Sequence, residues 1–146
     1  LSINGIVSPP EFTGTIKTGI SIIDLHSGEK RSLALLAVPG SEGLQTRKWL
    51  FNEDAIRWGN VVIAKAVPCD VLVIDELGPL EFERGLGFIN GFTAVDSGKY
   101  QYAVVVIRPS LLEKAANRWP TSQVIMVAPE TRDTLADELV KSFLNT

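Results

Sequence analysis

The stretch VLVIDELGPLE, residues 71–81, decides which fold this sequence can adopt. Its first four residues are apolar without alternation, which is typical of a strand buried on both faces inside a parallel sheet. Asp75 and Glu76 then place two carboxylates where that strand ends. Ligands of open α/β sheets bind at this edge of the strands. The stretch therefore predicts an α/β protein with an acidic ligand site at the end of a central strand.

Helices and strands are predicted to alternate on both sides of this stretch. A helix is expected from a cap at Asn52 to about residue 67, after a short strand at residues 49–51. Continuous apolar runs predict further strands at residues 102–107 and 123–127, and apolar faces predict helices at residues 88–97, 111–118 and 131–144. This order predicts a three-layer parallel α/β sheet with right-handed crossovers.

The first third of the chain predicts a β-hairpin added to that sheet. Residues 1–7 form a short apolar run that ends before two prolines. Residues 15–25 alternate apolar and polar side chains, residues 26–29 have turn composition, and residues 31–38 form the second arm. A length of 146 residues suits one such domain, residues 1–146.

The composition argues against several classes of protein. The net charge of −3 and a pI near 5.2 argue against a nucleic-acid-binding protein. No apolar run approaches the roughly 20 residues that a membrane-spanning helix needs. A single cysteine, Cys69, excludes an intrachain disulfide and fits a reducing compartment, so we expect a cytoplasmic protein. A single histidine, His26, excludes a histidine-rich metal site within one chain.

Asp75 and Glu76 are candidates for metal and water chemistry. In P-loop enzymes the aspartate of such a strand holds Mg²⁺, and an adjacent glutamate polarises the attacking water. An Asp-Glu pair alone is equally compatible with a solvated strand end. The Gly-Pro turn that follows, with a third carboxylate at Glu81, favours a functional site.

Stretches along nearly the whole chain carry a more specific resemblance. They are NGIVSP (4–9), KTGI (17–20), DLHSGE (24–29), LA (33–34), KWLF (48–51), DELGPLE (75–81), RG (84–85), VVIRP (105–109) and RW (118–119). In this order they resemble the nucleoside triphosphatases related to P-loop nucleotide kinases. The resemblance implies a P-loop NTPase-like fold, Mg²⁺ as cofactor, and ATP or GTP as substrate.

The sequence departs from that family at the phosphate-binding loop. No Gly-x-x-x-x-Gly-Lys-Ser/Thr occurs in it, and Lys17-Thr18 has the wrong glycine spacing. The loop strand is central in such folds, so the strands at 71–74 and 102–107 are expected to lack a neighbour or to pair differently. We expect roughly 30 to 40 residues before Leu1, or a separate chain, to supply a strand, loop and helix.

Three arginines are candidate ligands of the nucleotide. Arg108 ends a strand at the same edge as Asp75. Arg118 lies late in a predicted helix, where a lid arginine would contact the transferring phosphoryl group. Arg132 follows the last predicted strand, near where related folds contact the nucleobase. The plain reading is a solvated basic residue for the first two, and a helix start capped by Thr131 for the third.

Three functions follow from these residues. The leading hypothesis is Mg²⁺-dependent hydrolysis of a nucleoside triphosphate to diphosphate and phosphate. In it, Asp75 holds the metal, Glu76 activates water and Glu81 supports the site, and this chain carries the metal-and-water half. The alternatives are an inactive nucleotide-fold module that binds a partner protein, and a nucleotide kinase.

Overall fold

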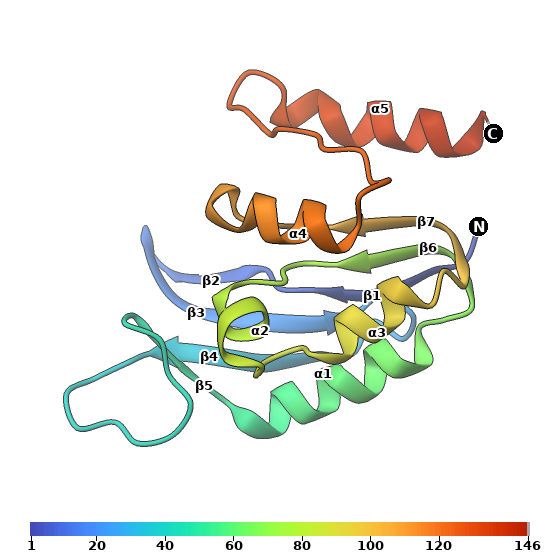
Figure 1. Ribbon diagram of the computed structural model, residues 1–146. Coiled ribbons are helices and arrows are strands. Elements are labelled where there is room, and N and C mark those ends of the chain that lie inside the picture. The colour runs from blue at the N-terminus through green and yellow to red at the C-terminus, as the bar shows by residue number, and fades with distance from the viewer. Residues whose placement is uncertain (146) are drawn as a thin grey trace. The chain divides into compact units, whose positions relative to one another are not determined.

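The computed structural model describes residues 1–145. The chain forms two compact units, Leu1–Leu112 and the residues from Glu113 onward. Figure 1 shows the sheet of the first unit, whose strand order is β5-β4-β3-β1-β6-β7 with β2 paired to β3. The strands are β1 (Ile3–Val7), β2 (Pro10–Thr13), β3 (Ile16–Asp24), β4 (Lys30–Leu36), β5 (Trp49–Phe51), β6 (Cys69–Ile74) and β7 (Tyr100–Val105). The helices are α1 (Glu53–Lys65), α2 (Pro79–Arg84), α3 (Asn90–Asp96), the 3₁₀ turn η1 (Pro109–Leu111), α4 (Leu112–Arg118) and α5 (Arg132–Leu144).

Strand β6 lies between two parallel neighbours. Ile6 of β1 is opposite Ile74 on one side, and Val105 of β7 is opposite Ile74 on the other. Leu72 and Ile74 are fully buried. The unbroken apolar run of this strand is explained by its central position, as the sequence predicts.

The sheet is mixed, so the predicted parallel sheet with an added hairpin is confirmed only in part: β1, β6 and β7 are parallel, and the rest is antiparallel. Strands β3, β4 and β5 are antiparallel to their neighbours, and β1 is antiparallel to β3. The reason is the short connections, since parallel neighbours need a long crossover whereas antiparallel arms need only a turn. The β3–β4 hairpin itself is confirmed, but β2 is missed because its first residue, Pro10, reads as a strand breaker. An edge strand accepts a proline there.

Gly5 allows β1 and β6 to come close together. Its φ is +120°, and a Cβ at this position would lie 1.9 Å from the Val73 carbonyl oxygen. A side chain at residue 5 would therefore push apart the two strands whose ends carry the candidate site.

The expected pairing of the two central strands is corrected in part. Strand β6 is paired on both sides, so residues 71–74 do not lack a neighbour; the other expected outcome was a different pairing, and β6 pairs directly with β7. Strand β7 is last in the order, and no other strand within residues 1–145 pairs with its second edge.

The strand predicted at residues 123–127 is not formed. Residues 122–128 have no regular structure, and Met126 and Val127 are 63% and 65% exposed. An apolar run becomes a strand only where another strand satisfies its backbone N–H and C=O groups. No strand within residues 1–145 pairs with this segment.

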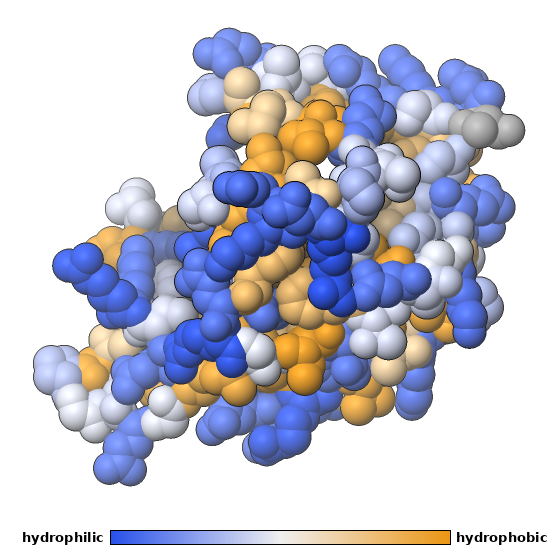
Figure 2. Space-filling view, viewed as in Figure 1, coloured by the Kyte–Doolittle hydropathy of each residue, from blue (hydrophilic) through white to orange (hydrophobic). Residues whose placement is uncertain are grey.

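Helix α1 covers one face of the sheet over β1, β3 and β4, and packs against α3. Its predicted cap is confirmed, because Asn52 Oδ1 accepts hydrogen bonds from the backbone N–H groups of Asp54 (3.0 Å) and Ala55 (3.2 Å). In the face viewed in Figure 2, apolar residues reach the surface among hydrophilic ones in the region of α1 and α2. In these elements and the loop after α2, Val61, Leu86 and Ile89 are exposed.

Candidate active site

Asp75 and Ser8 lie side by side at the end of the parallel strands. The β1–β6 register brings the ends of both strands to one edge of the sheet, and the Ser8 backbone N–H donates to Asp75 Oδ2 at 3.2 Å. The Ser8 hydroxyl oxygen is buried and has no hydrogen-bond partner within residues 1–145. A buried hydroxyl without a partner is unfavourable. The edge therefore presents a carboxylate and an oxygen atom that needs a ligand.

This pair of oxygen donors fits Mg²⁺. The ion prefers oxygen ligands, keeps several waters, and is bound in nucleotide enzymes by one or two protein groups plus substrate phosphates. Within residues 1–145, no group of three or more His, Cys, Asp and Glu side chains is arranged to hold a metal ion. The edge thus suits a metal that is shared with a phosphate, rather than one enclosed by protein carboxylates.

Ser8 was not among the predicted site residues. The signal that could have identified it is the apolar run of residues 1–7 together with that of residues 71–74. Had the two been recognised as parallel neighbours, the residue after the first would have been placed beside Asp75.

Glu76 is held by Arg108. Arg108 Nε donates to Glu76 Oε1 at 2.6 Å, and the two side chains are 59% and 32% exposed. The expectation that Arg108 lies at the same edge as the acidic pair agrees with this contact. Because both groups remain accessible, the ion pair orients Glu76 without removing it from solvent.

Glu81 is buried and bonded to the backbone. It is 7% exposed, and its two oxygens accept the N–H groups of Gly78 and Phe88, each at 3.1 Å. Burial raises the pKa of the Glu81 carboxyl, against the opposing effect of these hydrogen bonds. Gly87 packs so closely that a Cβ there would lie 2.5 Å from Glu81 Oε1. Glu81 therefore fixes the segment that follows Asp75 and Glu76.

A cleft of about 520 Å³ opens beside the acidic edge. Its walls include the apolar side chains of Ile20, Leu33, Phe51, Ile56 and Phe88, and its lining also contains Asp75, Glu76, Glu81 and Arg108. Three further cations, Lys17, Arg47 and Lys48, line the same cleft. Its volume lies within the range of small-molecule sites.

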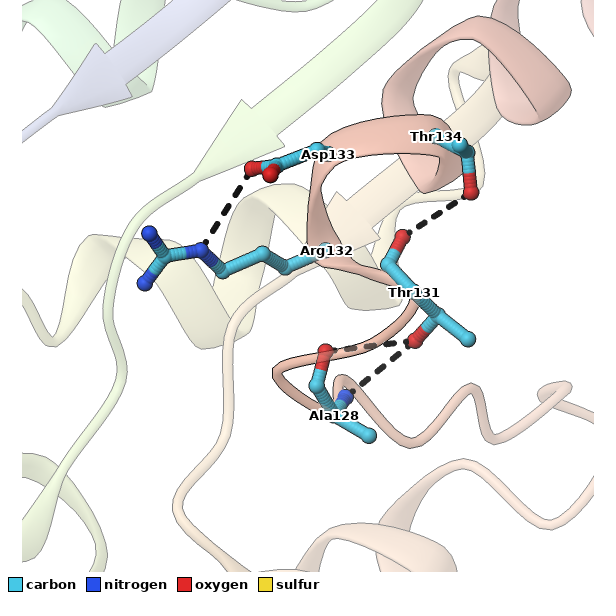
Figure 3. A network of polar contacts seen from close by, with 5 residues as sticks. All are labelled: Ala128, Thr131, Arg132, Asp133 and Thr134. Atoms are coloured by element: carbon cyan, nitrogen blue, oxygen red, sulfur yellow. Dashed lines mark hydrogen bonds and ion pairs between the residues drawn. The ribbon is translucent and has the colours of Figure 1, made fainter.

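The two remaining predicted arginines lie in the second unit, where each has a local contact. The Arg118 guanidinium lies 5.9 Å from the Trp119 ring centroid. Figure 3 shows Arg132 beside Asp133, with 3.4 Å between Arg132 Nε and Asp133 Oδ1. The Thr131 side chain bonds the backbone of Ala128 rather than capping α5. The roles predicted for Arg118 and Arg132 stay predictions.

Comparisons with known proteins agree with the fold. Residues 1–140 match the model of a protein family described as NTPase. Nucleoside-triphosphatase THEP1 of Methanosarcina barkeri is 26% identical over 128 residues, which are 87% of this chain and 71% of that protein. Within residues 1–145, no helix is both long and apolar enough to cross a membrane.

Two solved structures share the fold. A human cancer-related nucleoside triphosphatase superposes with a TM-score of 0.69 at 19% identity, over 99% of this chain and 82% of that one. THEP1 from the hyperthermophile Aquifex aeolicus superposes with a TM-score of 0.68 at 17% identity, over 97% and 84% of the two chains.

Proposed function

The chain belongs to the NTPase family, and from this premise we propose that it serves Mg²⁺-dependent hydrolysis of ATP or GTP to nucleoside diphosphate and phosphate. The observation that carries the proposal is the grouping of Asp75, Ser8 and Glu76 at the end of β6. These residues combine two oxygen donors for a metal with a neighbouring carboxylate that can take a proton from water.

Each residue has a distinct role in the proposal. Asp75 and Ser8 hold Mg²⁺, which when bound neutralises charge on the phosphate oxygens. Glu76 accepts a hydrogen bond from the attacking water and orients its oxygen toward the γ-phosphorus. The water oxygen forms the new bond to phosphorus, the bond to the bridging oxygen breaks, and the nucleoside diphosphate leaves. The water proton passes to Glu76 or to the released phosphate.

Arg108 is proposed to contact both Glu76 and the phosphoryl group. Its Nε donates to Glu76, and the guanidinium group carries further N–H donors. We propose that these donors bind oxygens of the transferring phosphoryl group, whose charge an arginine stabilises. Arg108 would then couple the position of Glu76 to the presence of phosphate.

We propose that the phosphate cradle comes from residues other than these 146, in the same gene product or in another chain. The sequence contains no Gly-x-x-x-x-Gly-Lys-Ser/Thr, whose backbone and lysine bind the phosphates in such enzymes.

Hydrolysis by the complete gene product tests the proposal. Glu76→Gln keeps the size of the side chain and removes the carboxylate, so we expect turnover of MgATP and MgGTP to fall by about 10²- to 10⁴-fold with little change in nucleotide affinity. The matched control is Glu138→Gln, an exposed position on α5, which should keep full turnover. Equal turnover of Glu76→Gln and the wild type would remove Glu76 from the mechanism.

A complete gene product that binds no triphosphate and hydrolyses none would favour the inactive partner-binding module. The kinase alternative predicts instead that turnover depends on an added phosphate acceptor. Measuring released phosphate with and without nucleoside monophosphates separates these cases.

A further inference from the structure

We propose that Asn60 is a positioning residue for Glu76, although it does not line the cleft. Asn60 is in helix α1, and the segment that it contacts, residues 85–89, joins α2 to α3 beside that helix (Figure 1). A series of contacts leads from the Asn60 side chain through this segment and Glu81 to the residues that follow Glu76. The inference rests on the proposed function, because it assigns Asn60 a role in the hydrolysis that Glu76 is proposed to serve.

The first step is the attachment of the segment to α1. Asn60 Nδ2 donates to the Gly87 carbonyl at 2.9 Å, and Asn60 Oδ1 accepts the Asn90 N–H at 3.0 Å. The segment's apolar side chains Leu86 and Ile89 are 41% and 44% exposed, so their burial contributes little to holding it. The hydrogen bonds of Asn60 therefore carry a large part of this attachment.

Phe88 supplies the apolar part of the attachment. It is 5% exposed and packs on α1 at Gly59, where a Cβ would lie 2.5 Å from Phe88 Cε1. Apolar burial has no directional preference, whereas a hydrogen bond weakens when its angle changes. We therefore expect Phe88 to hold the segment close to α1 and Asn60 to fix its orientation.

The second step joins the segment to Glu81. The Phe88 N–H donates to Glu81 Oε1, and a Cβ at Gly87 would lie 2.5 Å from the same oxygen. The residue that Asn60 holds and the next one in the chain thus meet the same carboxylate oxygen. Because Glu81 is buried, water does not readily replace a hydrogen bond that it loses. A shift of residues 87 and 88 therefore displaces Glu81 or leaves its oxygen unsatisfied.

The third step leads from Glu81 to Glu76. The other Glu81 oxygen, Oε2, accepts the Gly78 N–H. Gly78 lies against the Glu76 carboxylate, since a Cβ added there would be 3.0 Å from Glu76 Oε1. That oxygen is also the one to which Arg108 Nε donates. The position of Glu76 Oε1 is therefore set by Arg108 and by the segment that Asn60 holds.

Steady-state MgATP hydrolysis by the complete gene product is the first test. Asn60→Ala removes both side-chain hydrogen bonds, so we expect kcat to fall about 10- to 10²-fold while the KM for MgATP changes by less than about twofold. The control is Tyr100→Phe, which removes a side-chain hydrogen bond to the Val95 carbonyl, at the opposite end of α3 from Asn90, and should keep kcat. Unchanged kcat in Asn60→Ala, or an equal loss in Tyr100→Phe, overturns the inference.

A double-mutant cycle shows whether Asn60 acts through Glu76. In the Glu76→Gln background, Asn60→Ala should lower kcat by less than about twofold, because the carboxylate that Asn60 positions is already absent. The same loss in that background as in the wild type would show that Asn60 supports the fold alone, which contradicts the inference.

Amide hydrogen exchange of the same protein gives a readout that does not depend on activity. Asn60→Ala should speed the exchange of the Phe88 and Gly78 N–H groups about tenfold, since both are bonded to Glu81. Exchange at Leu72, which is fully buried in β6, should stay as in the wild type. Equal acceleration of all three amides would indicate global destabilisation and would overturn the inference.

Asn60→Asp keeps the test decisive if the alanine variant does not fold. It preserves the size of the side chain and the acceptor for the Asn90 N–H, and loses only the donation to the Gly87 carbonyl. We expect it to reproduce both the loss of kcat and the faster exchange.

The proposed function and the positioning role can fail separately. Absence of Glu76-dependent hydrolysis in the complete gene product would remove the proposed function, and with it the role of Asn60. Glu76-dependent hydrolysis with wild-type kcat in Asn60→Ala and Asn60→Asp would remove only the role of Asn60.

Discussion

Replacing Ser8 by alanine should stabilise the metal-free protein and at the same time weaken its use of Mg²⁺. The Ser8 hydroxyl oxygen is buried without a partner within residues 1–145. Leaving such a group unsatisfied costs about 1–3 kcal/mol, which Ser8→Ala recovers. For a protein of this size, each kcal/mol raises the melting temperature by about 2–4 °C. The alanine variant should therefore melt several degrees above the wild type in the presence of a chelator.

The same substitution removes an oxygen ligand beside Asp75. We expect the Mg²⁺ concentration that gives half-maximal MgATP hydrolysis by the complete gene product to rise about tenfold. The opposite signs of these two effects are informative, because a residue that only supports the fold would lower both stability and activity.

Ser21 provides the matched control for stability. It is 4% exposed, and its hydroxyl donates to Glu11 Oε1 at 2.5 Å, so Ser21→Ala deletes a satisfied hydrogen bond and should lower the melting temperature. The reasoning is refuted if Ser8→Ala melts below the wild type in chelator and keeps the wild-type Mg²⁺ dependence. Differential scanning calorimetry and a phosphate-release assay measure the two quantities.

Three further substitutions test other parts of the structure. Gly5→Ala should lower the free energy of unfolding, measured in urea, by at least about 3 kcal/mol, because the new Cβ meets the Val73 carbonyl. The control is Gly14→Ala, whose Cβ meets nothing within 4 Å, and it should lower the free energy of unfolding by only about 1–2 kcal/mol. Arg108→Gln should change the free energy of unfolding by less than about 1 kcal/mol, since its ion pair with Glu76 is solvent-accessible. The same variant should slow MgATP hydrolysis, and unchanged hydrolysis would contradict the proposed role of Arg108. Glu81 holds its proton to a higher pH in the folded protein than in the unfolded chain, because burial raises its pKa above 4.5. As the pH rises from about 4.5 through that raised pKa, the wild type should lose stability relative to Glu81→Gln; a relative gain over the same window would show that the carboxylate is favoured.

The sequence was sufficient to predict those elements whose pattern has one physical cause. The unbroken apolar residues 71–74 require burial on both faces, and β6 has it. Asn52 before two acidic residues is a helix start, and α1 begins there. The edge that joins Asp75, Glu76 and Arg108 followed from the rule that parallel strands end together.

Features that depend on partners distant in the sequence could not be predicted in the same way. The strand direction of β1 relative to β6 is set by contacts about 68 residues apart, such as that between the Ser2 and Asp70 side chains, and no local pattern encodes it. The apolar run at residues 123–127 has strand composition but no partner strand. Residues 77–81 read as a turn, whereas Glu81 stabilises the short helix α2 by accepting the Gly78 N–H. Lys17 and Lys48 line the same cleft although they are far apart in the sequence, and this grouping was not predicted.

The position of β7 at the end of the sheet also affects how this chain behaves as a purified sample. A strand at a sheet edge is a template on which another molecule can add a strand. Its residues Tyr100–Val105 include three consecutive apolar side chains at positions 103–105 and no charged residue, which are features of aggregation-prone segments. The chain alone should therefore form oligomers that grow with protein concentration, and a lysine in place of Ala103 should suppress them. Dilute storage, and a partner strand supplied before concentration, would protect the sample that every binding and hydrolysis assay needs.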